Sequence, residues 1–376
     1  SLSVVLATPL AWSESWPSYR HDSHRSGVCG ETLRFPLGEA WVHRASQAPR
    51  PAWPELPAMQ DVWHRIRPLG PTTAFDRAYH VAVEGGRVYY GSSADDTVVC
   101  LDAATGDTLW SFTTEGPVRL APTLSGGKVF VGSDDGCVYC LDAAEGKLVW
   151  KRRGVPEDRR LPGNGRMISL WPVRCGVAVE EGIVYFCAGL FPSQGSFLCA
   201  VNAADGSDRW RQPIEISPQG YLLVSPSHVY VPTGRTAPHA FDRATGQSAG
   251  ALPGGGWTSK AGGCFAVWAG DALAAAAGEE AGIQLAVPGS KEKIVLADGQ
   301  RLVLRGPLAY MLAKDRLCAV NRLEVAEAAR LRVKKDKTPA DQERIRELAR
   351  TRGRRWDVPC PDAFELILDG DMLFVG

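Results

Sequence analysis

Two short patterns in this sequence carry side chains that proteins use for chemistry. Cys137-Val-Tyr-Cys140 has the spacing of redox-active and metal-binding cysteine pairs. Pro117-Val-Arg119 and Pro172-Val-Arg174 repeat one tripeptide, and the planar guanidinium of arginine binds carboxylates and phosphates through paired hydrogen bonds. Whether either pattern forms a site depends on the elements that position it.

A short turn motif recurs through the middle of the chain and indicates what those elements are. Its copies are Asp102-Ala-Ala-Thr-Gly106, Asp142-Ala-Ala-Glu-Gly146, Asn202-Ala-Ala-Asp-Gly206 and Asp242-Arg-Ala-Thr-Gly246. β-Branched and aromatic residues, which favour strands, flank each copy, while Asp, Asn and Gly favour tight turns. Each unit therefore predicts four short antiparallel strands at a period of about 40 residues, which is typical of β-propeller blades.

Tryptophans recur at a fixed place in the last strand of these units. A propeller blade cannot bury both of its faces alone, so each blade stacks on its neighbours. We therefore interpret these tryptophans as blade-packing residues and not as ligand platforms. They are Trp110, Trp150, Trp210 and Trp356.

Degenerate copies of the unit continue towards the end of the sequence. Residues 263–300 predict a fifth, alanine-rich blade, Pro307–Asn321 predicts a hairpin of a sixth, and Phe364–Gly376 predicts the first two strands of a seventh. Glu39–His43 predicts a last, Trp-bearing strand that closes the ring. The expected fold is all-β, a propeller of four-stranded blades over residues 16–376, with seven or eight blades when complete and an incomplete C-terminal end.

A charged insertion interrupts the sixth unit. Cys318-Ala-Val-Asn321 repeats Cys199-Ala-Val-Asn202, but the chain reaches Trp356 only after a long excursion. Apolar spacing, with Thr338-Pro339 as a cap, predicts an α-helical hairpin over residues 322–353. Residues 322–355 hold twelve Lys or Arg and six Asp or Glu, so the hairpin is either a solvated surface or a docking site for an acidic partner.

The motif apolar-Asp-Ala-x-Thr-Gly-x-x-x-Trp resembles the repeat of the pyrroloquinoline-quinone-like (PQQ-like) propeller family, most clearly over residues 79–250. The opening Trp16–Gly27 is similar to the lead-in of exported members. The family includes quinoprotein alcohol dehydrogenases and non-catalytic BamB-type outer-membrane assembly lipoproteins. For the enzymes the resemblance implies PQQ above Ca²⁺, a catalytic Asp and a vicinal disulfide. This sequence has no adjacent cysteines, and its aspartates lie chiefly in repeat turns, so we expect no catalytic residue, cofactor or metal.

The cysteines and histidines favour packing over chemistry once strands are assigned. Cys137 and Cys140 lie three apart in a strand, where their side chains point to opposite faces and cannot share a ligand. Most of the ten cysteines alternate with apolar residues, as buried thiols do. His21, His24 and Cys29 could form part of a zinc site, but no second His/Cys group has matching spacing.

The arginine tripeptides precede the innermost strands of two successive blades, and those strands line the central channel of a propeller. Several basic and amide side chains should therefore converge at one channel mouth and bind a carboxylate, a phosphate or an acidic peptide. The alternative is that they bond to loop carbonyls and tie the blades together. The candidate rim residues are Arg77, His80, Arg119, Asn164, Arg166, Arg174, Gln219 and Arg235.

Composition and the chain ends bound the class of protein. The 42 Lys and Arg balance 42 Asp and Glu, so a dedicated nucleic-acid binder is not expected. No apolar run is long enough to span a membrane. Residues 1–15 resemble the end of a signal peptide, which predicts export to the periplasm, the cell envelope or the medium of a bacterial-type cell; the alternative is that Leu2–Leu10 forms a buried strand.

The function that we predict is an exported, monomeric propeller acting as a binding or assembly scaffold for a peptide, a protein or a small anionic ligand. The physical basis is a rigid radial frame with no nucleophile, base and orienting group that can be placed together. Two alternatives stay open at this point. One is a PQQ- and Ca²⁺-dependent oxidoreductase, and the other is an accessory propeller to a separate catalytic domain.

Overall fold

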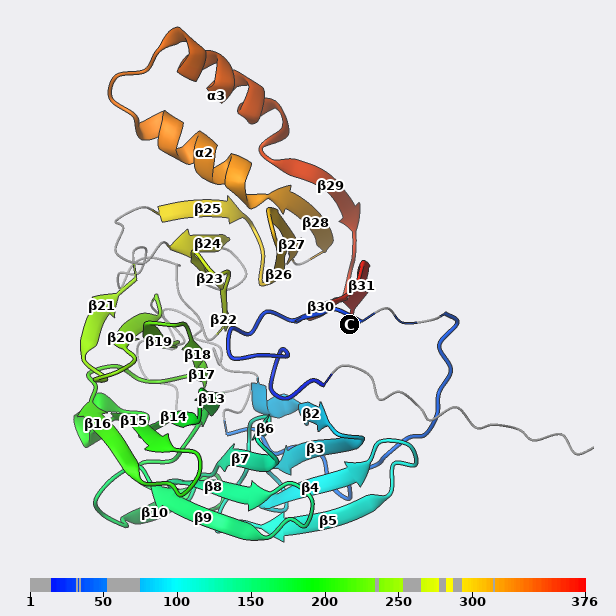
Figure 1. Cartoon of the computed structure of the whole chain (residues 1–376), viewed down its shortest axis with the longest axis vertical. Helices are drawn as coiled ribbons and strands as arrows, with labels where there is room; N and C mark the ends of the chain where they lie inside the picture. The colour runs from blue at the N-terminus through cyan, green and yellow to red at the C-terminus, as the bar shows by residue number, and fades with distance from the viewer. Residues whose placement is uncertain are drawn as a thin grey trace, which may run out of the picture.

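The structure, a computed structural model, describes residues 15–31, 33, 35–52, 75–233, 237–252, 265–276, 282–286, 293–313 and 315–376. Antiparallel four-stranded sheets follow one another around a common centre (Figure 1), as the repeat predicts. The predicted signal-peptide remnant falls on residues that, Ser15 excepted, lie outside this description.

Six sheets are complete four-stranded blades among the described residues. Blade 1 contains β2 (Val81–Glu84), β3 (Arg87–Ser92), β4 (Thr97–Asp102) and β5 (Thr108–Thr113). Blade 2 contains β6 (Thr123–Ser125), β7 (Lys128–Gly132), β8 (Cys137–Asp142) and β9 (Leu148–Arg153). Blade 3 contains β13 (Ala178–Glu180), β14 (Ile183–Ala188), β15 (Phe197–Asn202) and β16 (Asp208–Pro213).

The later blades keep this order although their sequences are degenerate. Blade 4 contains β18 (Leu223–Val224), β19 (His228–Val231), β20 (His239–Asp242) and β21 (Ser248–Ala251). Blade 5 contains β22 (Phe265–Trp268), β23 (Leu273–Ala276), β24 (Ile283–Ala286) and β25 (Lys293–Ala297). Blade 6 contains β26 (Arg301–Arg305), β27 (Leu308–Leu312), β28 (Arg316–Asn321) and β29 (Arg354–Pro359).

The seventh sheet has three strands, because an N-terminal strand joins it from the other end of the chain. β1 (Val28–Cys29) pairs in parallel with β30 (Leu366–Asp369), which pairs with β31 (Met372–Val375). Further short elements lie between blades: the 3₁₀ turns Phe75–Arg77 and Pro192–Gln194, the hairpin of β10 (Arg160–Gly163) and β11 (Arg166–Ser169), and the parallel pair of β12 (Cys175–Gly176) and β17 (Gly220–Tyr221).

Tryptophans at three of the four predicted positions contact the turn of the next blade. Trp110 donates its indole Nε1–H to the Ala143 carbonyl in the turn of blade 2, at 3.1 Å. Trp150 donates to the Ala203 carbonyl of blade 3 at 3.2 Å, and the Trp210 ring lies against Gly246 of blade 4. Glycine ends these turns because its φ is positive and because the ring leaves no room for a Cβ; at Gly146 a Cβ would lie 2.5 Å from Trp110.

The segment 39–43 is not a strand, so that part of the ring-closure prediction is wrong. Trp41 nevertheless lies where a last-strand tryptophan would lie, since its Nε1–H donates to the Ala103 carbonyl of blade 1 at 3.0 Å. Ring closure rests instead on β1, which the sequence analysis did not recognise as a strand.

The helical insertion has the predicted form. α2 (Arg322–Val333) begins at the N-cap Asn321, and α3 (Pro339–Thr351) begins at a capping box formed by Thr338 and Asp341. α2 packs on β25 of blade 5, where Ala326 joins the apolar core, and α3 packs on α2 (Figure 1). In the described part of the chain, neither helix has the length and apolar character of a membrane span.

Candidate functional site

The centre of the ring is filled by the hub segment, which we define as residues Trp16–Gly30. Its backbone pairs with inner strands around the ring: Trp16 with Val83 of β2, and Pro17 with Leu124 of β6. Further along, backbone N–H groups of β18, β22 and β30 donate to carbonyls of the hub segment at 2.9–3.0 Å. The channel that the repeat predicts is therefore occupied by the chain itself.

Two buried arginines of the hub segment complete these contacts. Arg25 is 1% exposed and donates to the carbonyls of Leu222 and Val177, which precede the inner strands of blades 4 and 3. Burial lowers the pKa of its guanidinium to about 10, so it stays charged at neutral pH. Arg20 donates to the Leu302 carbonyl of blade 6 at 2.7 Å and pairs with Glu365 of blade 7 at 2.5 Å.

An aromatic cluster covers the hub segment near the predicted channel mouth. The Tyr19 and Tyr221 rings stack with centroids 3.8 Å apart, and His80 meets Tyr19 edge to face at 5.2 Å. Burial lowers the pKa of His80 and outweighs its hydrogen bond with the Phe75 carbonyl, so the imidazole is neutral at pH 7. Burial raises the pKa of the Tyr221 phenol, whose oxygen accepts the Ala121 N–H at 2.8 Å.

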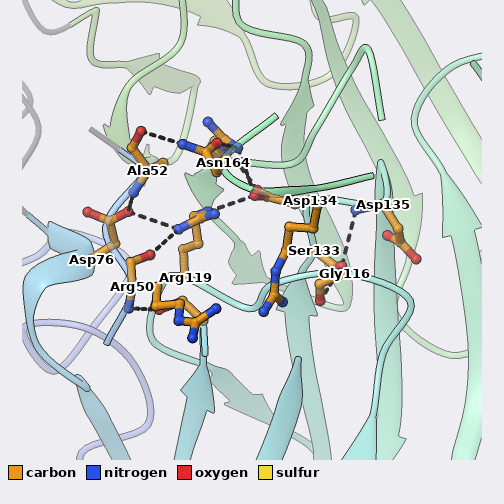
Figure 2. A network of polar contacts seen from close by, with 12 residues as sticks. Arg50, Ala52, Asp76, Gly116, Arg119, Ser133, Asp134, Asp135 and Asn164 are labelled. Atoms are coloured by element: carbon orange, nitrogen blue, oxygen red, sulfur yellow. Dashed lines mark hydrogen bonds and ion pairs between the residues drawn. The ribbon is translucent and has the colours of Figure 1, made fainter. Parts of the chain in front are cut away.

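The two arginines of the repeated tripeptide, Arg119 and Arg174, meet at one carboxylate, Asp134. Figure 2 shows Asp134 beside Arg119. Arg119 donates Nε–H to one oxygen at 2.7 Å, and Arg174 donates through Nε and Nη2 to both oxygens, each at 2.7 Å. The Asp134 side chain is fully buried, and those of Arg119 and Arg174 are 5% and 8% exposed. Asp134 thus takes the place that an external anion would take.

A second acid and an amide extend this network to the loop before blade 1 (Figure 2). Asp76 Oδ2 accepts from the Ala52 N–H at 2.6 Å and lies 3.3 Å from Arg119 Nη1. Asn164 accepts from Arg174 Nη2 at 2.8 Å and donates to the Ala52 carbonyl at 2.7 Å. These bonds tie blade 1, blade 2 and the β10–β11 hairpin together.

The other predicted rim residues are only partly brought together. Arg166 pairs with Asp96 and donates to the Ala94 carbonyl, so it secures the β10–β11 hairpin to blade 1. Gln219 donates to the Ser217 hydroxyl at 3.2 Å. Arg77 is exposed at the end of the first 3₁₀ turn. Arg235 lies outside the described residues. Binding of an anion or acidic peptide at this mouth stays a prediction.

Sequence reasoning missed the acids that neutralise the rim. Asp134 stands in Ser133-Asp-Asp-Gly136, which reads as an ordinary turn, and Asp76 follows a stretch without any repeat signal. Glu365 directly precedes the innermost strand β30 and Arg301 opens β26, whereas Arg119 and Arg174 lie four residues before β6 and β13. Charged residues at the start of an innermost strand were therefore a usable signal that the search for the tripeptide did not cover. Glu365 and Arg301 lie 3.3 Å apart, and Glu365 also pairs with Arg20.

The cysteines of the described residues are all free thiols, and all but Cys360 are buried. Burial raises the pKa of both Cys137 and Cys140 to about 12, so neither is a nucleophile at neutral pH. In the same part of the chain, no group of three or more His, Cys, Asp or Glu side chains is placed to hold a metal ion.

The described residues do not fit a PQQ–Ca²⁺ centre on the ring axis. A flat quinone there would have to displace the stacked Tyr19 and Tyr221 rings and the hub segment beneath them. A calcium ion needs several free carboxylate or amide oxygens, whereas those of Asp134 and Asn164 already accept from arginines.

Comparisons with known proteins agree with this architecture. The family model described as outer membrane protein assembly factor BamB matches residues 60–170. The structure of a quinohemoprotein alcohol dehydrogenase from Comamonas testosteroni is similar with a TM-score of 0.58 and 14% identity, over 96% of this chain and 70% of that one. BamB from Moraxella catarrhalis has a TM-score of 0.47 and 16% identity, over 65% and 70%.

The class of protein is therefore a β-propeller built of four-stranded blades with an α-helical insertion. More specifically, the repeat motif and the family model over residues 60–170 support a PQQ-like repeat β-propeller. No curated protein matches its sequence.

Proposed function

We propose that this chain is an exported binding or assembly scaffold without redox chemistry of its own. The observation that carries the proposal is the filled centre, where the hub segment bonds to the inner strand of each of the seven blades. A dehydrogenase of this fold would need that space for its cofactor. The match to a family described as an outer membrane assembly factor supports a role in the cell envelope with a protein partner.

The helical hairpin is the surface that we propose for an acidic segment of that partner. α3 packs mainly on α2 and not on a blade. Five of the six acids in residues 322–355 already pair with arginine or lysine. Four exposed cations make no ion pair among the described residues: Arg332, Lys335, Arg350 and Arg352.

These four cations lie towards the two ends of α3, which spans about 20 Å. A partner with acidic groups at that spacing would reach both ends at once. Exposed charges act mainly by attracting the partner during association. Salt screens such charges beyond a Debye length of about 10 Å at 0.1 M, so the affinity should fall steeply as the salt concentration rises.

The cofactor part of the proposal is tested by calorimetric titration of PQQ with Ca²⁺ into the protein. We expect no saturable heat, because the axis is filled. Binding near one equivalent together with dye-linked alcohol oxidation would show that the chain is an oxidoreductase instead.

The partner surface is tested with a fluorescent poly-glutamate peptide and a variant in which Arg332, Lys335, Arg350 and Arg352 become glutamine. We expect the variant to lose at least about tenfold in affinity at low salt. The matched control also removes four exposed positive charges, all far from the hairpin, and should bind as the original protein does; in it Arg44, Arg159, Arg209 and Arg211 become glutamine. Equal loss in both variants would mean general charge attraction, and the hairpin would then have no special role.

A further inference from the structure

A small pocket lies on the face of the ring opposite the rim arginines. It is placed where the inner strands of blades 5 and 6 end, and His24 and Ser26 of the hub segment line it together with these strand ends. The rim arginines precede inner strands, whereas this pocket follows them, which places it on the other face. Its volume is about 270 Å³, so it suits one small organic group and not a larger cofactor.

Two aromatic side chains of this pocket carry N–H groups that nothing in the described chain accepts. The imidazole of His24 makes no hydrogen bond there, and neither does the indole of Trp268. The Trp268 backbone N–H donates to the His24 carbonyl at 2.9 Å, so the two residues are held side by side. The Trp268 ring also stacks on Tyr230, with centroids 5.4 Å apart. The pocket therefore offers two positioned donors to a ligand.

Arg322 supplies a positive charge to the same pocket. Its side chain is 11% exposed, its Nε–H donates to the Gly306 carbonyl at 2.9 Å, and its Nη1 lies 3.0 and 3.1 Å from the two oxygens of Asp271. These contacts fix the guanidinium but leave its Nη2 without an acceptor among the described residues. Because a nearly buried donor without a partner costs free energy, an acceptor in the pocket would be stabilised there.

The chemistry of these groups matches a carboxylate. An imidazole, an indole and a guanidinium all donate hydrogen bonds, and a carboxylate accepts them on both of its oxygens. A phosphate dianion matches less well, because Arg322 is the single permanent cation among the described residues that line the pocket and already shares its charge with Asp271. Val267 and Leu304 add apolar surface beside the donors, which suits a short hydrocarbon chain.

We propose that this pocket binds a monocarboxylate with a short apolar chain, either as a free acid or as the last residue of a peptide. The carboxylate accepts from His24, from the indole of Trp268 and from Nη2 of Arg322, while the apolar chain lies against Val267 and Leu304. The site does not include the four cations proposed as a partner surface on the helical hairpin. This proposal and the proposed function can therefore fail independently of each other.

The probe for this site is isovalerate, and its neutral analogue isovaleramide is the control. Nuclear magnetic resonance of the tryptophan indole N–H groups follows binding, with the Trp268 signal assigned from Trp268→Phe. We expect isovalerate to shift this signal saturably at one site per chain, and isovaleramide to bind at least about tenfold more weakly. N-Acetyl-leucine distinguishes the two sources of the carboxylate: tighter binding than isovalerate indicates a peptide terminus, and weaker binding indicates a free acid.

Substitutions test the donors one at a time. His24→Ala and Arg322→Gln should each weaken isovalerate binding at least about fivefold. The matched control His43→Ala, which removes a histidine that contacts Tyr90 of blade 1, should bind as the original protein does. The comparison of isovalerate with isovaleramide needs no variant, so a substitution that unfolds the chain leaves the test intact.

Three results would overturn the proposal. One is equal affinity for isovalerate and isovaleramide, which would mean a purely apolar hole, and another is displacement of isovalerate by inorganic phosphate at equal concentration, which would mean a site for any anion. The third is unchanged isovalerate binding by both His24→Ala and Arg322→Gln with unchanged circular dichroism spectra. A Trp268 signal that does not move at about 50 mM isovalerate, far above a millimolar Kd, would overturn it as well.

Discussion

Asp134→Asn is the substitution that best tests whether the rim arginines belong to the fold. The buried Asp134 carboxylate accepts from Arg119 and Arg174, and the change leaves two nearly buried guanidiniums with the Asp76 carboxylate as the remaining acid in contact. Breaking a buried ion pair on one side costs about 3–5 kcal/mol. The asparagine oxygen still accepts one hydrogen bond, so we expect a loss of about 3 kcal/mol.

Thermal unfolding followed by circular dichroism measures this loss. At about 2 cal/mol/K of unfolding entropy per residue, a chain of this length shifts by roughly 1.3 °C per kcal/mol, so Tm should fall by about 4 °C. Adding Arg174→Met to Asp134→Asn removes the unpaired positive charge and should restore at least half of the lost stability. A double-mutant cycle of the two substitutions gives the interaction energy between Asp134 and Arg174.

The opposite result has a clear meaning. A fall in Tm below about 1 °C would show that water solvates both guanidiniums, and the arginines would then be available to an external anion. A second variant, Asp134→Ala, offers another readout: formate should raise its Tm, because its arginines lack their carboxylate, and should not raise the Tm of the original protein.

Three further predictions concern the ring and its centre. Arg25→Met should lower Tm by several degrees because it strands the buried Leu222 and Val177 carbonyls, whereas the exposed Arg332→Met should change stability by less than about 0.5 kcal/mol. Gly106→Ala should cost more than Gly126→Ala by thermal unfolding, since both have positive φ but only Gly106 lies against a tryptophan. Burial would raise the pKa of Asp22, yet hydrogen bonds from His21 and Ser26 lower it to about 2. The ionised carboxylate therefore contributes its full stabilisation above about pH 4, and this stabilisation is lost as the pH falls towards 2. Asp22→Asn should flatten the dependence of Tm on pH between about pH 4 and pH 2.

The repeat made the blades predictable from sequence because each turn requires particular residues. Asp102 and Gly106 cap and close their turn through a side-chain acceptor and a positive φ, and both leave a mark in the sequence. Blades 5 and 6 were placed by analogy with the earlier units, helped by Cys318-Ala-Val-Asn321, which repeats Cys199-Ala-Val-Asn202, but the first strand of blade 6, β26, was not predicted.

The hub segment could not be predicted in the same way, because its contacts are made largely with backbone groups. The carbonyl of Leu222 or Val177 is the same group whatever the side chain, so no residue type marks it as a partner of Arg25. The role of Asp134 was hidden for a related reason: turn aspartates are common, and only the ring geometry brings this one between two arginines from different connections.

The hub segment also changes how the ring should come apart. In a repeat protein held by nearest-neighbour contacts, units open one at a time and the terminal ones fray first. Here a segment from the beginning of the chain bonds to β30 near its other end, so opening any inner strand disturbs an element shared by all. Amide hydrogen exchange should therefore give the same opening free energy for the inner strands of all blades. The outer strands should open independently of one another, with lower opening free energies.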